Sequence, residues 1–180
     1  MTNIKEKLLL HICCAPCATH SIIAFNENFS IEGFFYNPNI EPLDEYEKRI
    51  NALNKLIEFS DIDLLIGNYD NARWRDFIKG FERDKEGGNR CRLCIKFRLD
   101  LAAKTALYRG IKKFSTTLSI SPHKNLDMIN EEGEIAAKKY GVNFVAVDLK
   151  KNNGFAKSVE LSKKYGLYRQ KYCGCLFGIS

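Results

Sequence analysis

The sequence predicts an α/β protein in which helices flank a mostly parallel sheet, formed by one domain that spans residues 1–180. Short apolar segments alternate along the chain with longer segments of helical periodicity. A strand–helix–strand connection of this kind is right-handed and joins parallel strands. No repeat, low-complexity stretch or linker divides the chain, and roughly 100–200 residues is the usual size of one domain.

Five segments are expected to form the sheet because each is short, continuous and apolar. The first, residues 8–12, has the sequence Leu-Leu-Leu-His-Ile and is followed directly by cysteines. The other predicted strands are residues 31–36, 63–66, 113–117 and 143–148.

Six segments are expected to be helical because apolar residues recur in them every three or four positions. Three of these helices end at a glycine, which readily adopts the left-handed backbone of a helix C-terminus. The predicted helices are residues 19–26, 43–59, 71–81, 91–109, 125–140 and 156–165. Residues 83–89 and 119–124 are expected to be loops, and the tail from residue 167 carries the last cysteines.

The composition indicates a soluble globular protein, with 45% hydrophobic and 28% charged residues. No apolar run approaches the roughly 20 residues of a membrane span, so we expect no membrane contact. The first apolar run is too short for a secretory signal, which favours a cytoplasmic protein. The formal net charge of +6 is compatible with a nucleic-acid partner. Arg90, Arg92, Lys96 and Arg98 are expected to contact phosphates or to form a solvated face.

Seven cysteines carry most of the functional information. Their odd number and the absence of a secretion signal disfavour a disulfide framework. They fall into three groups: Cys13, Cys14 and Cys17 (C-C-x-x-C), Cys91 and Cys94 (C-x-x-C), and Cys173 and Cys175 (C-x-C). Three such groups in one chain indicate metal or redox chemistry.

The first group follows the first predicted strand, at the edge of the sheet where α/β proteins bind their ligands. Nucleotide-binding relatives of this architecture place a glycine-rich phosphate loop there. This chain has no G-x-G-x-x-G or G-K-[ST] sequence. Thiolate ligands at this position therefore favour a metal centre over an ATP-dependent enzyme, the alternative being three small residues that pack a tight turn.

The second group begins a predicted helix, whose N-terminus favours the thiolate forms of Cys91 and Cys94. Together with Cys13 and Cys14 these residues supply four thiolates, which suit tetrahedral zinc and a four-iron cluster equally well. Adjacent cysteines are unusual in zinc knuckles.

The third group is too closely spaced for a relaxed disulfide, so a bond between Cys173 and Cys175 would be strained and easily reduced. This spacing favours a redox relay, and two further metal ligands are an almost equal alternative.

Five other residues have weaker functional interpretations. Asp70 is a candidate metal ligand or proton donor, although an aspartate after a strand is more often a helix N-cap. His11 is a candidate metal contact or a hydrogen-bonded core residue. Trp74, Tyr168 and Tyr172 are candidates for stacking on a splayed base, with packing as the alternative.

Five motifs of the chain resemble the QueH-type epoxyqueuosine reductases, in the same order and over nearly the whole length. They are H-I-C-C-A-P-C (11–17), Y-N-P-N-I (36–40), E-G-G-N-R-C-R-L-C (86–94), T-T-L-S-I-S-P-H-K (116–124) and Y-R-Q-K-Y-C-G-C (168–175). The family usually places a serine directly after the aromatic residue of the tail, whereas here Gly178 and Ile179 separate Phe177 from Ser180.

The resemblance implies the last step of queuosine synthesis, the cobalamin-independent reduction of epoxyqueuosine at the wobble position of tRNA anticodons. It also implies a fold related to the adenine-nucleotide alpha-hydrolase (Rossmann-like) group and a bacterial cytoplasmic setting. The expected partners are tRNA carrying epoxyqueuosine and a separate electron donor. A zinc-stabilised RNA-binding module and a metal-free thiol–disulfide protein are the alternatives.

Residue by residue, the resemblance implies that Cys13, Cys14, Cys91 and Cys94 hold a [4Fe-4S] cluster. Cys173 and Cys175 would form the redox pair. Asp70 is expected to be a proton source or a ligand of an additional iron ion, and Cys17 is a further candidate metal ligand.

Overall fold

A five-stranded, all-parallel sheet organises the protein, with the strand order β3-β2-β1-β4-β5. The computed structural model describes residues 5–179, so Ser180 lies outside the described residues. All five predicted strands are confirmed. They are β1 (Glu6–Ile12), β2 (Phe29–Phe35), β3 (Asp63–Ile66), β4 (Lys113–Thr116) and β5 (Asn143–Phe144).

The strand β5 is shorter than the predicted 143–148. It is an edge strand that pairs only with β4. The N–H of Val145 still donates to the carbonyl of Phe114 (2.8 Å), but the chain then turns at Asp148, whose carbonyl accepts from Lys151 N–H. The apolar sequence therefore extends past the last residue of β5 that pairs with β4.

All six predicted helices are present, and their bounds differ from the predicted ones by a few residues. They are α1 (Ala15–Asn26), α2 (Leu43–Ile57), α3 (Asn71–Phe77), α4 (Asn89–Tyr108), α5 (Leu126–Tyr140) and α6 (Gly154–Lys164). The helix α1 begins four residues earlier than predicted because Pro16 lies in its first turn, where the fixed φ of proline suits a helix. The predicted loop 119–124 starts with a 3-10 turn, Thr117–Ile120, which the hydroxyl of Thr116 caps.

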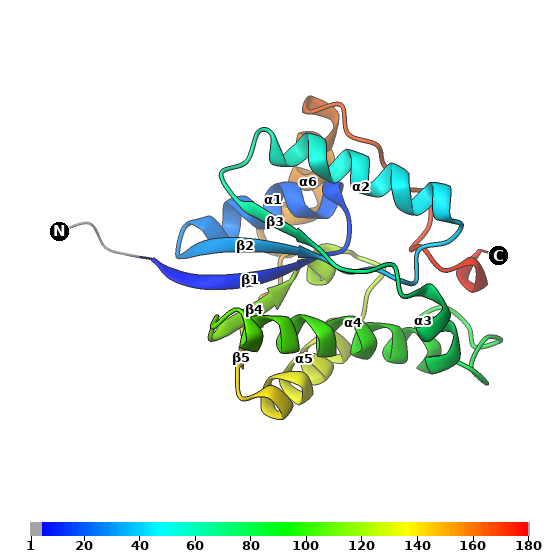
Figure 1. Cartoon of the computed structure of the whole chain (residues 1–180). Helices are drawn as coiled ribbons and strands as arrows, with labels where there is room; N and C mark the ends of the chain where they lie inside the picture. The colour runs from blue at the N-terminus through cyan, green and yellow to red at the C-terminus, as the bar shows by residue number, and fades with distance from the viewer. Residues whose placement is uncertain (1–4, 180) are drawn as a thin grey trace.

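The helices cover both faces of the sheet, with α1, α2 and α6 on one side and α4 and α5 on the other (Figure 1). Alternate residues of β1 pack into two separate cores. Leu8, Leu10 and Ile12 belong to the core beneath α1 and α2, and Leu9 belongs to the core beneath α4 and α5. A strand that is buried on both faces is expected to have a continuous apolar sequence, as β1 does.

The position of the site follows from the strand order. The chain passes from β1 to β2 and β3 on one side, and returns to β4 and β5 on the other side. Ligand sites of open α/β sheets lie at the carboxyl ends of the strands beside such a switch point, here between β1 and β4. The C-terminal segment lies at this same end of the sheet (Figure 1).

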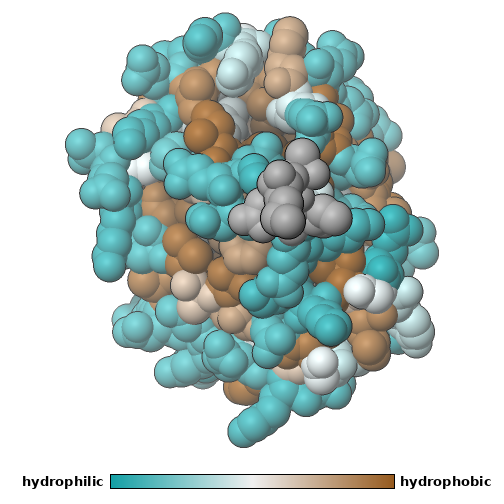
Figure 2. Space-filling view, turned by 90° about the vertical axis from the view of Figure 1, so that its left-hand side faces the viewer, coloured by the Kyte–Doolittle hydropathy of each residue, from teal (hydrophilic) through white to brown (hydrophobic). Residues whose placement is uncertain are grey.

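The opposite end of the molecule, from which the strands start, carries hydrophilic side chains interspersed with small hydrophobic areas (Figure 2). Ion pairs join neighbouring strands and helices there, for example Lys113 with Glu6 (2.7 Å) and Arg109 with Glu32 (2.6 Å). Across the described residues, no helix has both the length and the apolar character that crossing a membrane requires.

Candidate metal centre

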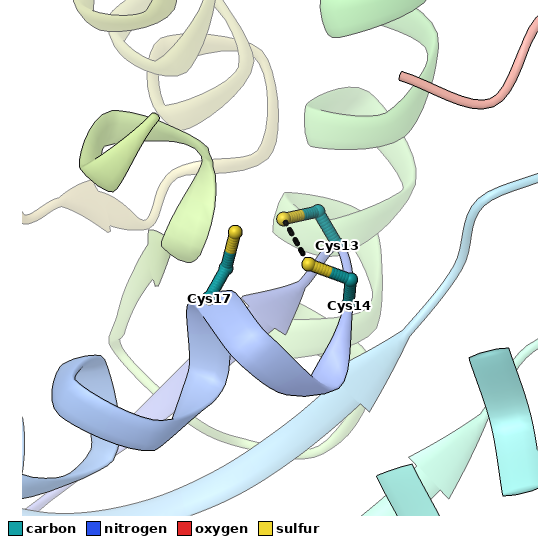
Figure 3. Close-up of side chains that lie close together, drawn as sticks. All are labelled: Cys13, Cys14 and Cys17. Carbon is teal, nitrogen blue, oxygen red and sulfur yellow. Dashed lines mark hydrogen bonds between the residues drawn. The ribbon is translucent and has the colours of Figure 1, made fainter. Parts of the chain in front are cut away.

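Three cysteines converge where β1 joins α1. Cys13 and Cys14 follow the last residue of the strand, and Cys17 lies in the first turn of the helix. The three Sγ atoms lie within 4.8 Å of one another, and those of Cys13 and Cys14 are 3.8 Å apart (Figure 3). The structure thus groups Cys17 with the two predicted ligands in an arrangement that could hold a metal ion.

Hydrogen bonds concentrate negative charge on one sulfur of this triad. Donation from Cys14, Cys17 and Thr117 lowers the pKa of Cys13 well below its usual value. The hydrogen bonds that Cys14 and Cys17 donate to Cys13 raise the pKa of Cys14 to about 12 and raise the pKa of Cys17 well above its usual value. The hydroxyl of Thr117 donates to Cys13 Sγ (3.2 Å) and accepts from Cys13 N–H (3.0 Å), which fixes the thiolate against the turn after β4.

A cavity of about 410 Å³ opens beside the triad. Cys13, Cys17 and Cys173 contribute to its wall, together with the cationic side chains of Arg49, Arg98, Lys124, Arg169 and Lys171. Pockets for small ligands usually measure about 300–1,000 Å³. This cavity therefore has the size of a ligand site and a predominantly positive wall.

A second, much smaller cavity of about 10 Å³ adjoins the first and shares Arg98, Lys124 and Cys173 with it. Four cysteines surround it: Cys91, Cys94, Cys173 and Cys175. The structure thus divides the predicted ligand set into two pairs. Cys13 and Cys14 lie with Cys17, whereas Cys91 and Cys94 lie with the tail cysteines.

The C-x-x-C pair lies at the start of α4, as predicted. The N–H of Gly87 donates to Cys91 Sγ (3.2 Å). Cys94 is buried in a cluster with Trp74, Ile78 and Cys175. This burial raises the pKa of Cys94, although Arg98 partly opposes it, so the expected stabilisation of the thiolate by the helix N-terminus does not prevail at Cys94.

Arg49 anchors the C-x-C tail to α2. Its guanidinium donates to the carbonyls of Cys173 (2.9 Å) and Tyr172 (3.0 Å) while its Nε bonds to Glu45 (2.8 Å). Gly174 has φ +138°, and a Cβ on it would lie 2.9 Å from Asn39 Nδ2, so both backbone conformation and space require glycine.

The two tail thiols are free and electrostatically unequal. Burial raises the pKa of Cys173, but Lys124, whose Nζ lies 2.8 Å from Cys173 Sγ, and Arg98 outweigh it, so the pKa is lowered. Burial raises the pKa of Cys175 to about 11. Lys124 and Arg98 therefore favour the thiolate form of Cys173, whereas burial favours the protonated form of Cys175.

His11 and Asp70, which were candidates for metal contact, bond instead to groups of the protein. His11 is fully buried and bonds to Thr116 Oγ1 (2.9 Å) and the Tyr36 carbonyl (3.1 Å), and burial lowers its pKa to about 4, so it is the hydrogen-bonded core residue. Asp70 occupies the N-cap position of α3, but its side chain makes no capping hydrogen bond and instead accepts from the hydroxyl of Tyr36 (3.1 Å). It lines neither cavity.

The expected phosphate contacts are wrong for Arg90 and Arg98, whereas Arg92 and Lys96 lie on a partly exposed, ion-paired face. Arg90 and Arg98 are only 1% and 2% exposed, because they donate to the carbonyls of Glu82 and Cys94 inside the protein. Arg92 forms ion pairs with two glutamates of α5 at 2.8 and 3.0 Å, one of which also lies 4.0 Å from Lys96.

The three aromatic residues that were candidates for stacking on a base, Trp74, Tyr168 and Tyr172, differ in their burial and contacts. Trp74 is fully buried, so the packing alternative is confirmed for it. Tyr168 donates to Glu45 (2.7 Å), and Tyr172 lines the large cavity.

Sequence reasoning missed Arg49, Thr117 and Lys124. Arg49 lies at helical spacing from Tyr46 and Leu53, on the buried face of α2, and this spacing was the available signal. Thr117 and Lys124 lie in the motif 116–124, but nothing in that motif indicates that they approach cysteines distant in the chain.

The residues around the cavities fit a sulfur-rich, anionic metal group. Seven thiols lie in or beside the cavities, and two cations, the buried Arg98 and the partly buried Lys124, lie where the cavities meet. Burial lowers the pKa of Arg98, but the cysteines Cys94, Cys173, Cys13 and Cys91 reverse the shift, so it is raised. Iron–sulfur clusters are held by thiolates and tuned by nearby charge and hydrogen bonds.

These features define a Rossmann-like α/β protein whose strand-end ligand site is lined by thiols instead of a phosphate loop. Residues 8–180 match the family described as epoxyqueuosine reductase QueH. The chain therefore belongs to the epoxyqueuosine reductase QueH family and is an oxidoreductase, as its motifs predicted.

Several curated relatives carry that family name. The protein from Thermotoga maritima is 41% identical over 175 residues, which cover 96% of this chain and 90% of the relative. The protein from Streptococcus pyogenes is 37% identical over 181 residues, covering 97% and 71% of the two chains. The protein from Acinetobacter baylyi is 38% identical over 178 residues, covering 97% and 81%.

Proposed function

We propose that this protein reduces epoxyqueuosine to queuosine in tRNA, in the cytoplasm, and that the reaction takes place in the large cysteine-lined cavity. The observation that carries the proposal is membership of the QueH family over residues 8–180, combined with a ligand-sized cavity that three of the cysteines line.

The reaction needs two electrons and two protons. Both C–O bonds of the epoxide break, a C=C bond forms, and the oxygen leaves as water. Two thiols supply the two electrons when they form one S–S bond, and we assign that role to Cys173 and Cys175. Lys124, whose Nζ lies 2.8 Å from Cys173 Sγ, favours the thiolate form of Cys173, and burial favours the protonated form of Cys175. When Cys173 reacts as the thiolate, the Cys175 thiol supplies one proton and the Lys124 ammonium supplies the other. A separate electron donor then restores the dithiol.

Cys13, Cys14, Cys91 and Cys94 are the proposed ligands of a [4Fe-4S] cluster, and Cys17 is the proposed thiol for an additional iron ion. When bound, such a group supplies single-electron transfer and a Lewis-acidic iron. The chain itself supplies buried positive charge from Arg98 and a fixed Cys13 sulfur through Thr117. Asp70 lines neither cavity, so we propose it only as a proton source that reaches the site indirectly, and Asp70→Asn should lower turnover.

We assign tRNA contact to the mouth of the large cavity instead of the surface around Cys91. His123, Arg169 and Lys171 are exposed there, and Glu86 is the one acidic side chain among the described residues that line the cavity. Phe155 and Tyr172 add aromatic faces, and splayed single-stranded bases stack on such faces. The phosphates of the anticodon loop would then contact the basic rim.

The decisive experiment incubates anaerobically purified protein with epoxyqueuosine-containing tRNA and a low-potential reductant, and measures queuosine in the digested tRNA. Iron, zinc and acid-labile sulfide are determined on the same sample. Queuosine formation by an iron–sulfur protein supports the proposal. A zinc-loaded protein that binds tRNA without converting it would establish the RNA-binding alternative, and turnover without metal would establish the dithiol alternative.

Single Cys→Ala variants test the ligand set. Replacement of a proposed cluster ligand should remove most of the iron and sulfide. Full cluster content in all four variants, Cys13→Ala, Cys14→Ala, Cys91→Ala and Cys94→Ala, would show that the ligands are elsewhere.

A further inference from the structure

Unpartnered hydrogen-bond donors gather at a single place in the protein. Within residues 5–179, the buried side-chain nitrogens without a hydrogen-bond acceptor are Asn39 Nδ2, Trp74 Nε1, and Nε and Nη2 of Arg90. Asn39, Trp74 and Arg90 are at most 1% exposed. All three line the small cavity. Buried donors are almost always paired, so their clustering indicates an acceptor at this position.

The same cavity is lined by four cysteines. Trp74 packs in one buried cluster with Cys94 and Cys175. The amide of Asn39 lies against Gly174, between the two tail cysteines. The unpartnered donors of Trp74 and Asn39 therefore lie beside the sulfur-lined region, and Arg90 lines the same cavity.

A trapped water does not account for these donors. The cavity of about 10 Å³ has room for about one water molecule. One water accepts two hydrogen bonds, fewer than the unpartnered nitrogens require. Protonated thiols are weak acceptors, whereas metal-bound thiolates carry negative charge and accept hydrogen bonds well.

We propose that Trp74, Asn39 and Arg90 donate hydrogen bonds to the thiolate sulfurs around this cavity when those sulfurs ligate a metal group, and that the indole N–H of Trp74 raises the reduction potential of that group through Cys94. This inference rests on the proposed function only in requiring a redox-active metal group at Cys91 and Cys94. It makes Trp74 a positioning residue that acts through a ligand.

The direction of the effect follows from electrostatics. Reduction adds negative charge to the cluster and its sulfurs, so a hydrogen bond to a ligand sulfur stabilises the reduced form more than the oxidised form. Removal of the donor should therefore make the group harder to reduce. An equilibrium constant that falls tenfold corresponds to a potential shift of about 59 mV for one electron.

The test replaces the donor while keeping an aromatic ring. Trp74→Phe protein should retain its iron and sulfide, and its midpoint potential should fall by an amount equivalent to a several-fold change in the reduction equilibrium. Phe77→Leu is the matched control, because Phe77 lies on the same helix and has no donor to lose. An unchanged potential in fully loaded Trp74→Phe protein, or an equal shift in the control, would overturn the inference.

The wild-type protein provides a second measurement that does not depend on the variant folding. The chain has one tryptophan, so indole-¹⁵N labelling marks Trp74 alone. Pulsed EPR of the reduced protein should detect coupling between the paramagnetic group and this nitrogen. Absence of coupling overturns the inference while epoxyqueuosine conversion still tests the proposed function. Coupling in a protein that converts no epoxyqueuosine would refute the function and leave the hydrogen bond established.

Discussion

Replacement of Arg49 by leucine should destabilise the protein strongly, although Arg49 is remote from the proposed metal ligands in the chain. The side chain is 2% exposed, its partner Glu45 is 7% exposed, and their Nε–Oε1 distance is 2.8 Å. The variant leaves a buried carboxylate without its cation and removes the donors for two tail carbonyls. Among the side chains of residues 5–179, only the hydroxyl of Tyr168 would still donate to Glu45.

The magnitude follows from the cost of breaking a buried ion pair, about 3–5 kcal/mol. We take about 3 kcal/mol, at the lower end of that range, because Tyr168 remains and leucine fills part of the space. In a protein of this size 1 kcal/mol shifts the melting temperature by about 2–4 °C, so the melting temperature should fall by about 6–12 °C.

Lys48→Leu provides a matched control on the same helix. Lys48 pairs with Asp44 at 3.1 Å, also at i,i+4, but these side chains are 55% and 65% exposed. Such a surface pair contributes about 0.3–0.5 kcal/mol, so the control should melt within about 2 °C of the wild type. Circular dichroism of anaerobic, equally loaded samples measures both variants. Equal shifts in the two variants would refute the assignment of Arg49 as the anchor of the tail.

Three further outcomes are expected. Gly174→Ala should retain its iron and lose at least tenfold in turnover, because alanine at φ +138° costs about 1–3 kcal/mol of backbone strain and its methyl group meets a buried amide. Cys173→Ala should retain its cluster and fail in multiple-turnover reduction of epoxyqueuosine, whereas joint loss of iron and activity would identify Cys173 as a ligand. Arg169→Ala combined with Lys171→Ala should weaken tRNA binding and lower the slope of log affinity against log salt by about 2, measured by fluorescence anisotropy. Lys163→Ala, on the exposed end of α6, should leave that slope unchanged, and an equal effect would argue against a specific rim.

The fold was largely predictable because its signals are local. A strand covered on both faces must be apolar throughout, and a helix that packs on a sheet must repeat its apolar residues every three or four positions. The edge strand β5 was overpredicted because the sequence does not indicate where a ladder partner ends. The helix α1 was underpredicted because its first turn contains Pro16 and Cys17, which were interpreted as part of the cysteine-containing turn after the strand.

The site was predictable in its components and less so in its grouping. The proximity of Cys17 to Cys13 follows from the turn of helix between them. The approach of Cys94 to Cys175 is a tertiary contact, which depends on where α4 packs and on how the tail is anchored. The charge of Arg98 is evident in the sequence, but its burial between the cavities is not. An arginine near a cysteine pair therefore serves as internal positive charge here, and not as a contact for phosphate.

The anchored tail also determines when the site is completed during synthesis of the chain. A ribosome completes the Cys13, Cys14 and Cys17 triad long before it makes the segment that supplies Cys173 to the same cavity. During that interval the triad lacks the part of the cavity wall that the tail supplies. The wall is complete only after the tail has docked onto Arg49, so this ion-paired arginine links completion of the chain to completion of the site.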